Sequence, residues 1–181
     1  VEYPGKTGSV PAYLLEAGVG LTRWQRPSTP PRPPVEVDTP DYRNPQLRAA
    51  ITDFIAALGA RYDGDARIGF VTAGMLGLWG EWHDYPRTEL FADKALQGAV
   101  MSAYAQAFRT TPILLRYPAG EADPVYVANA AAPFGYHDDS FAWNTLATKP
   151  HYFMAKLQTA GATNVWQTRP IGGEIRPDAW G

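Results

Sequence analysis

Two glutamates stand in surroundings that suit acid–base chemistry. Glu81 lies in the stretch GLWGEWH, residues 77–83, between Trp79 and Trp82, and Glu174 follows a pair of glycines. Hydrolysis of a glycosidic bond needs one carboxylic acid to protonate the leaving oxygen and a second carboxylate that attacks, or activates water, from the other side of the sugar. Indole faces can stack on sugar rings, and an apolar wall raises the pKa of a nearby carboxyl group. The two glutamates are therefore candidates for a catalytic pair.

Further polar and aromatic side chains follow short apolar runs that resemble strands. These runs are residues 68–71, 112–117, 134–136 and 164–168. In parallel α/β sheets the carboxyl ends of the strands form the ligand-binding face, so we expect these side chains to converge on one site. The residues expected to bind the substrate are Trp79, Trp82, His83, Arg116, Tyr136, His137, Asp138, Trp166 and Arg169.

Two other functions stay open. A carbohydrate-binding module or pseudo-enzyme would keep the aromatic residues without turnover. A metal-dependent hydrolase could be built on His83, His137, Asp138 and Asp139, but the sequence has no HExxH motif or similar local spacing. Glycoside hydrolysis by two carboxylates needs no Lewis acid, so we expect neither a metal nor a cofactor.

The composition argues against several classes of partner. Sixteen Lys and Arg against 18 Asp and Glu give a net charge of -2, and no basic run suggests a nucleic-acid surface. No apolar run approaches the roughly 20 residues that a membrane-spanning helix needs. The absence of cysteine excludes disulfides and cysteine nucleophiles without fixing the compartment. We expect a carbohydrate as partner, no nucleic acid and no membrane; the localisation stays open, with a secreted or periplasmic place favoured.

The elements that must position these side chains alternate along the chain. Apolar residues at helical spacing predict helices over residues 45–58, with Asn44 as N-cap, and over residues 96–108. Less regular patterns predict helices at residues 124–131 and 149–160. Strands and helices in alternation favour a parallel sheet covered by helices, either an open doubly wound sheet or a (β/α)8 barrel. No glycine-rich phosphate-binding motif follows a strand, which favours the barrel.

Six motifs lie in order between residues 62 and 174: YDGD, RIGF, GLWGEWH, RYP, GYHDD and PIGGE. Together, over residues 41–177, they resemble a poorly characterised group of bacterial proteins related to the (β/α)8 glycoside hydrolases. In the retaining clan of these enzymes the acid/base glutamate follows strand 4 and the nucleophile follows strand 7. The resemblance therefore implies that Glu81 is the acid/base and Glu174 the nucleophile, although Glu81 follows Gly80 where the clan usually has asparagine.

The length predicts an incomplete barrel. A complete (β/α)8 barrel takes about 250 residues, whereas this chain has 181. Counting back from GLWGEWH makes residues 1–3 the end of strand 2 and residues 10–16 the entry to strand 3. We therefore expect a single domain over residues 1–181, a partial TIM barrel that lacks its first and last strands and belongs to a longer protein. Association with a partner would cover its open sheet edges.

Overall fold

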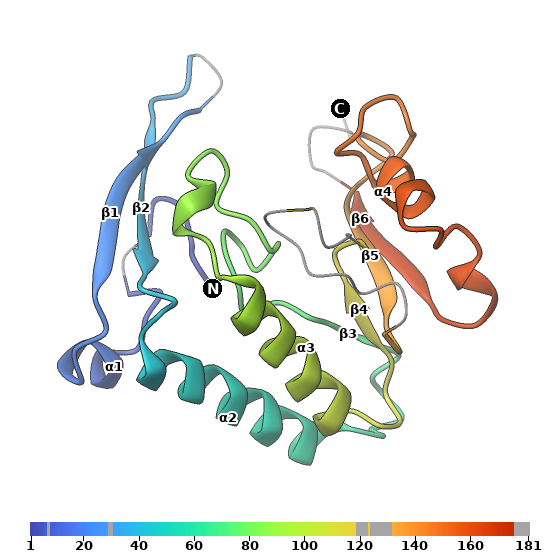
Figure 1. Ribbon diagram of the computed structural model, residues 1–181, viewed down its shortest axis with the longest axis horizontal. Helices are drawn as coiled ribbons and strands as arrows, with labels where there is room; N and C mark the ends of the chain where they lie inside the picture. Colours follow the sequence, from blue (N-terminus) through green and yellow to red (C-terminus); the bar gives the residue numbers. More distant parts are fainter. Residues whose placement is uncertain (7, 29–30, 119–122, 124–131, 176–181) are drawn as a thin grey trace.

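The computed structural model describes residues 1–6, 8–28, 31–118, 123 and 132–175. These residues form an α/β structure with two separate sheets (Figure 1). The first is an antiparallel ribbon of β1 and β2, and the second is a parallel sheet with the strand order β3-β4-β5-β6.

The elements follow one another along the chain with these bounds. The helices are α1 (Ala12–Glu16), α2 (Pro45–Tyr62), α3 (Lys94–Ala107) and α4 (Phe153–Thr159), with short 3-10 turns η1 (Thr88–Leu90) and η2 (Val165–Gln167). The strands are β1 (Leu21–Arg26), β2 (Val35–Pro40), β3 (Val71–Thr72), β4 (Ile113–Leu115), β5 (Gly135–Phe141) and β6 (Ile171–Ile175).

The predicted start of α2 is confirmed. The side chain of Asn44 accepts hydrogen bonds from the backbone N–H groups of Gln46 and Leu47, and Pro45 is the first helical residue. Leu47, Ile51 and Ile55 then form a buried stripe at helical spacing. The predicted helices that became α3 and α4 and the strands that became β4 and β5 are also confirmed, with somewhat different ends.

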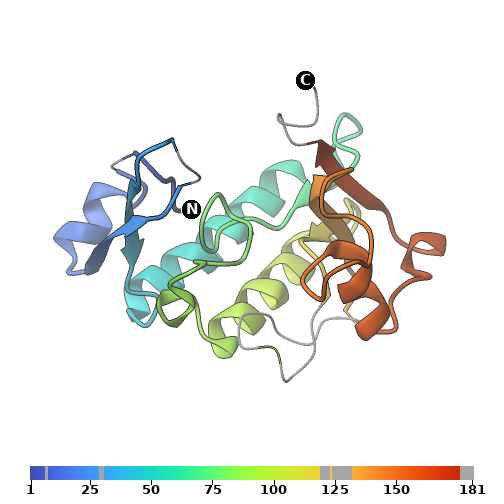
Figure 2. The ribbon, with the colours of Figure 1, turned by 90° about the horizontal axis from the view of Figure 1, so that it is seen from above.

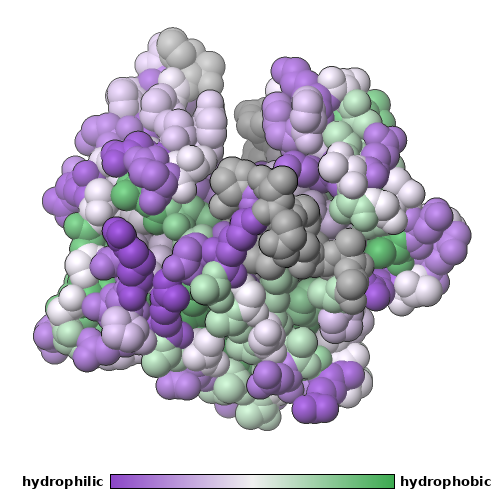
Figure 3. All heavy atoms as spheres, in the orientation of Figure 1, coloured by the Kyte–Doolittle hydropathy of each residue, from purple (hydrophilic) through white to green (hydrophobic). Residues whose placement is uncertain are grey.

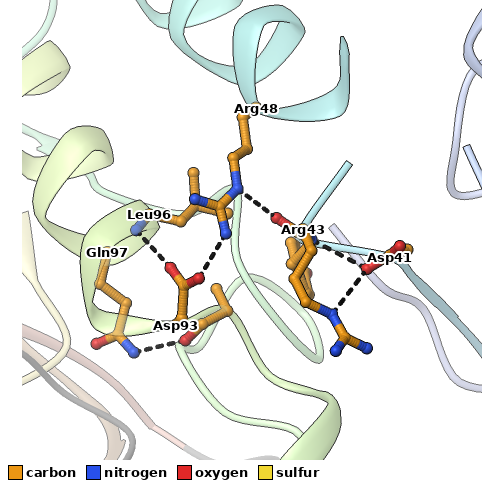
Figure 4. A network of polar contacts seen from close by, with 8 residues as sticks. Asp41, Arg43, Arg48, Asp93, Leu96 and Gln97 are labelled. Carbon is orange, nitrogen blue, oxygen red and sulfur yellow. Dashed lines mark hydrogen bonds and ion pairs between the residues drawn. The ribbon is translucent and has the colours of Figure 1, made fainter. Parts of the chain in front are cut away.

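A polar network joins the beginnings of α2 and α3 (Figure 4). The guanidinium of Arg48 donates from Nη2 to Asp93 Oδ2 at 2.6 Å and from Nε to the carbonyl of Tyr42 at 2.7 Å. Asp93 is also the N-cap of α3, since its Oδ1 accepts from the N–H of Leu96 at 2.8 Å. One carboxylate therefore caps one helix and holds an arginine of the other, which fixes how the two helices lie side by side.

The ribbon packs against the loop that follows β3. Trp24 and Val37 face each other across the ribbon and are buried together with Leu78 of that loop, with the partly buried Leu90 packed against them. The indole N–H of Trp24 donates to Thr39 Oγ1 at 2.9 Å, so the buried ring has no unsatisfied donor. Figures 1 and 2 show the loop, in green, between the ribbon and the parallel sheet.

The predicted (β/α)8 fold is wrong. In the described residues the parallel sheet has four strands, four α-helices are present, and the ribbon is antiparallel. Residues 10–16, predicted to enter a strand, contain α1 instead, because Pro11 precedes a helical turn that ends before Gly18 at φ +92°. Among the described residues, the only strand-like pairing of residues 1–3 is the isolated bridge between Glu2 and Leu78. The chain therefore does not have the arrangement of a barrel that has lost its two end strands.

Two local predictions also need correction. Residues 164–168, predicted as a strand, include the 3-10 turn η2, and the strand begins later at Ile171, so that the two glycines and Glu174 lie within β6. The strand predicted at residues 68–71 is reduced to Val71–Thr72. The helix predicted at residues 124–131 lies outside the described residues. No helix among the described residues has both the length and the apolar character needed to cross a membrane.

Gly59 lets α2 approach α3 closely. A Cβ atom at this position would lie 2.4 Å from the carbonyl oxygen of Ala107, which is backbone and has no room to move aside. Gly98 in α3 has no atom within 4 Å of the corresponding position. The two helix glycines thus have opposite roles: one is required by packing, and the other only weakens its helix.

We expect Gly59→Ala to lower the free energy of unfolding by about 1–3 kcal/mol, because the added methyl group must push the two helices apart. Gly98→Ala is the matched control and should raise it by roughly 0.5–1 kcal/mol, since alanine is the better helix former. Urea denaturation followed by circular dichroism measures both. Equal effects of the two substitutions would contradict the close contact at Gly59.

Candidate functional site

Each of the four parallel strands brings one ionisable group or more to the same edge of the sheet. Glu81 and His83 follow β3, Arg116 follows β4 directly, Asp139 lies in β5 and Glu174 in β6. The carboxyl ends of adjacent parallel strands meet at one edge, which is where ligands bind in such sheets. In the space-filling view the molecule is notched between the side of the ribbon and the side of β5 and β6 (Figure 3).

Arg116 connects the groups at this edge. Its Nη2 lies 2.7 Å from Asp139 Oδ2, and its Nη1 donates to the backbone carbonyl of Glu81 at 2.7 Å. The same Nη1 lies 3.7 Å from Glu81 Oε2. The guanidinium therefore holds the carboxylate of one strand and the backbone of the loop after another, and it brings positive charge to both acids.

The carboxyl groups of Glu81 and Asp139 share a hydrogen bond. Burial raises the pKa of Glu81 above its ordinary value, against the opposing charge of Arg116. Burial also raises the pKa of Asp139 to about 6; Arg116 again opposes this, and the negative charge of Glu81 adds to it. Two carboxyl groups in such contact share a proton that they release only near pH 6, within the pH range where many enzymes work.

Glu174 faces the same side of the sheet. It is two residues from Gly172, and residues two apart in a strand share a face. A Cβ atom at Gly172 would lie 3.8 Å from Nδ1 of His137, which shares its own face of β5 with Asp139. Burial is the main cause that raises the pKa of Glu81, and the negative charge of Glu174 adds to it. The side chain of Glu174 is exposed, whereas that of Glu81 is largely buried.

His83 is a neutral hydrogen-bond donor to Glu81. Burial, followed by the charge of Arg116, lowers the pKa of His83 to about 3. Its Nδ1 accepts from the N–H of Tyr85 at 3.2 Å, so in the neutral ring the proton is on Nε2. This Nε2 lies 3.2 Å from Glu81 Oε2. The imidazole therefore steadies the carboxylate without adding a charge to the site.

The two tryptophans beside Glu81 have different environments. Trp82 is 1% exposed, and its indole N–H donates to the carbonyl of Ala73 at 2.5 Å, so it is a core residue. Trp79 is 37% exposed, and its ring centroid lies 6.4 Å from that of His83. The guanidinium of Arg26 lies 4.8 Å from the centroid of the Trp79 ring. Only Trp79 can therefore form a wall that a ligand could touch.

The loop that carries these residues is tightly wound. Trp79 and Trp82 have φ values of 53° and 60°, in the left-handed region that bulky residues rarely adopt. A Cβ atom at Gly77, which has φ +73°, would lie 2.5 Å from the carbonyl oxygen of His83. The glycines of GLWGEWH thus allow the chain to fold back on itself, which turns Glu81 toward the other strands.

Three of the expected binding residues lie elsewhere. Asp138 faces away from Asp139, and its carboxylate accepts hydrogen bonds from the N–H of Ser140 at 3.0 Å and from Thr145 Oγ1 at 2.5 Å. Trp166 and Asp138 line a different cavity of about 460 Å³ beside α4. Arg169 donates to the carbonyl oxygens of Ala132 and Phe134 before β5 begins, where it supports the backbone.

Two more of the expected residues lie in β5 beside Asp139. Tyr136 is fully buried and shares the face of Asp138. His137 shares the face of Asp139, and its buried Nδ1 has no hydrogen-bond partner among the described residues. Of the pair, only His137 therefore belongs to the edge where Glu81 lies.

Two residues that the structure places near Glu81 were not among the expected binding residues. Asp139 was considered only as a metal ligand, although strand alternation in GYHDD would have put it on the face of His137 and opposite Asp138. Arg26 comes from the distant ribbon, and nothing in its local sequence indicates a role. As for the metal hypothesis, no three His, Asp or Glu residues in the described part of the chain are arranged to hold a metal ion.

A second buried acid pair anchors the loop from behind. Glu2 accepts hydrogen bonds from Thr39 Oγ1 at 2.5 Å and from the hydroxyl of Tyr42 at 2.9 Å, and this hydroxyl accepts from the N–H of Gly77 at 2.8 Å. Asp84 is fully buried, and burial together with the negative charge of Glu2 raises the pKa of Asp84 to about 8. The hydrogen bonds of Glu2 and Tyr42 thus tie the loop to the ribbon and to the start of α2, and the raised pKa of Asp84 keeps this buried acid protonated beside them.

We expect the free energy of unfolding to fall by about 2 kcal/mol between pH 6 and pH 8. Asp84 has a folded-state pKa of about 8 against an ordinary value of 3.8, so its contribution to stability is complete below pH 4 and is lost as the pH rises through 8. Asp84→Asn should remove most of this dependence of the free energy of unfolding on pH. Asp53→Asn, on the exposed side of α2, should leave the dependence unchanged. Urea denaturation at a series of pH values measures it, and an unchanged slope in Asp84→Asn would contradict a protonated Asp84.

Comparison of the chain with protein-family models, with curated proteins and with solved structures found no match. The resemblance of six short motifs to a group related to (β/α)8 glycoside hydrolases is wrong, because the topology differs and no comparison supports it. Any role of Glu81 and Glu174 therefore rests on the geometry and chemistry of the site.

Proposed function

We propose that this chain hydrolyses glycosidic bonds, with Glu81 as the proton donor and Glu174 as the second carboxylate. One observation carries the proposal: a desolvated carboxyl group that shares a hydrogen bond with a second acid lies on the same side of the sheet as an exposed carboxylate, whose negative charge adds to the effect of burial in raising its pKa. Glycoside hydrolysis requires two carboxyl groups in such unlike environments.

Glu81 is the better proton donor of the two glutamates. Its raised pKa keeps it protonated at a higher pH than an exposed glutamate. Asp139, with a pKa of about 6, can return a proton to Glu81 through the hydrogen bond that they share. Arg116 holds both in place, and its charge stabilises the carboxylate that Glu81 becomes once the proton has moved to the leaving oxygen.

Glu174 completes the reaction from the other side of the bond. Its exposed carboxylate can attack the anomeric carbon or take a proton from an attacking water, and the distance between the two carboxyl groups in the substrate complex decides which of these occurs. Direct attack retains the anomeric configuration, whereas attack by water inverts it. The half-exposed ring of Trp79, beside the neutral His83, supplies a flat apolar surface for the sugar.

We expect Glu81→Gln to lower kcat on glycosides with a poor leaving group by about 10²–10⁴-fold, and to have less effect on 4-nitrophenyl glycosides, whose leaving group needs little proton donation. Glu174→Gln should lower kcat on both kinds of substrate, because its role does not depend on the leaving group. Glu16→Gln, on the exposed part of α1, is the control. Turnover of oligosaccharides and of 4-nitrophenyl glycosides measures these effects, and proton NMR of the first product gives the anomeric configuration.

Full activity of Glu81→Gln on oligosaccharides would contradict its role as the acid. If the native chain binds sugars without turnover, and Trp79→Ala abolishes that binding, the protein is a carbohydrate-binding module rather than an enzyme.

We expect the activity to survive dialysis against a strong chelator, because proton donation and attack by carboxylates need no Lewis acid. Circular dichroism recorded on the same samples shows whether the fold is intact. Loss of activity from a folded protein, with recovery on adding zinc or calcium, would instead favour a metal-dependent hydrolase.

A further inference from the structure

Arg26 extends from the ribbon toward the site. It is the last residue of β1 and shares a face with Trp24, which is buried against Leu78 of the site loop. The packing of Trp24 therefore determines where Arg26 lies: its guanidinium sits over the ring of Trp79, two residues from Glu81. The neighbouring Arg23 has the opposite orientation, and its Nε pairs with Asp38 Oδ1 at 2.8 Å.

The contacts of Arg26 leave its charge without a carboxylate partner. Among the described residues it forms no ion pair, and its Nε, although buried, has no hydrogen-bond partner. Its charge nevertheless reaches the site, since it lowers the pKa of both Glu81 and His83. Arg116 differs in this respect, because Asp139 faces it at 2.7 Å.

A guanidinium that lies over an aromatic ring at the rim of a site, with donors still to satisfy, is a group that recognises anions. Its planar set of N–H donors matches the two oxygens of a carboxylate. The cation–π contact with Trp79, at 4.8 Å from the ring centroid, holds the guanidinium at the rim of the site, where it can meet a ligand. A neutral sugar offers only hydroxyl groups there, which would leave the charge uncompensated.

We propose that the site takes glycosides of sugars that carry a carboxylate, the uronic acids, and that Arg26 binds this carboxylate. The inference rests on the glycoside hydrolysis proposed above and names its substrate class. The sugar ring would lie beside Trp79, with its glycosidic oxygen toward Glu81 and its carboxylate at the guanidinium of Arg26. Arg26 is then a residue of specificity, while the proton transfer belongs to Glu81.

The test compares sugars that differ only at C6. The 4-nitrophenyl β-glucuronide and β-glucoside form one matched pair, and the corresponding galacturonide and galactoside, in both anomeric forms, give the others. We expect the native chain to have a higher kcat/KM on the uronides. Arg26→Gln should lower kcat/KM on the uronides by at least about tenfold, the size expected for one lost charge-assisted hydrogen bond. The same substitution should change kcat/KM on the neutral glycosides by less than about twofold.

Two further variants separate recognition from structure. Arg26→Lys keeps the charge without the planar fork and should retain part of the preference. Arg23→Gln, on the other face of the same strand, should leave it unchanged. Equal loss on uronides and neutral glycosides in Arg26→Gln would show that Arg26 only supports the loop, and it would overturn the proposal.

Binding measured by calorimetry on Glu174→Gln, with the methyl uronides and methyl glycosides, distinguishes the two proposals. Hydrolysis without preference for uronides overturns the inference about Arg26 and leaves the proposed function. Uronide binding that Arg26→Gln abolishes, without turnover by the native chain, overturns hydrolysis and supports recognition of the carboxylate. Binding of neither kind of sugar overturns both.

Discussion

The site depends on one arginine that meets two acids. Taking Glu81 and Asp139 out of water disfavours their charged forms, and Arg116, which lies between them, opposes this for both acids. Because Arg116 follows β4 directly, the central part of the parallel sheet determines where it can reach. Its bond to the backbone of Glu81 and its ion pair with Asp139 then connect the ends of three adjacent strands.

The loop after β3 needs a second support, because its conformation is unfavourable by itself. Two tryptophans in the left-handed region would relax if the loop were free. Glu2 and Tyr42 hold it at Gly77, and Trp24 holds it at Leu78. The ribbon therefore stabilises the loop that presents Glu81, and through the same packing it brings Arg26 to the rim of the site.

The sequence was sufficient where structure depends on neighbours along the chain. Asn44 and Pro45 predicted the start of α2 because a helix cap is a local interaction, and apolar runs predicted β4 and β5. The fold was not accessible in this way: alternating strands and helices suit several parallel arrangements, and the pairing of β1 with β2 across a proline-rich segment depends on contacts distant in sequence. The six motifs misled because part of their content is structural. Asp63 of YDGD, for example, accepts hydrogen bonds from the N–H groups of Arg109, Thr110 and Thr111 and so joins the end of α2 to the approach of β4.

The site was predicted in part for the same reason. That side chains at the ends of parallel strands would converge followed from the alternation of elements alone, and Glu81, His83, Arg116 and Glu174 do lie at one edge. Which residue of a strand faces that edge depends on its exact register, so Asp138 was chosen where Asp139 makes the contact. Arg26 could not be found from the sequence, because its place depends on how Trp24 packs against Leu78.

The two buried acid pairs have similar side chains, but their surroundings give them different pKa values and therefore different roles. Glu2 accepts hydrogen bonds from two hydroxyl groups, Asp84 is buried beside it, and neither acid faces an arginine among the described residues. The pKa of Asp84 rises to about 8, so that this pair holds its proton at neutral pH. Glu81 and Asp139 have Arg116 between them, and the pKa of Asp139 rises only to about 6. A proton that leaves near pH 6 suits the proton transfer proposed above, whereas the proton that Asp84 holds to about pH 8 serves the stability of the loop. The arginine is thus the difference between a pair that can transfer a proton and a pair that fixes the backbone.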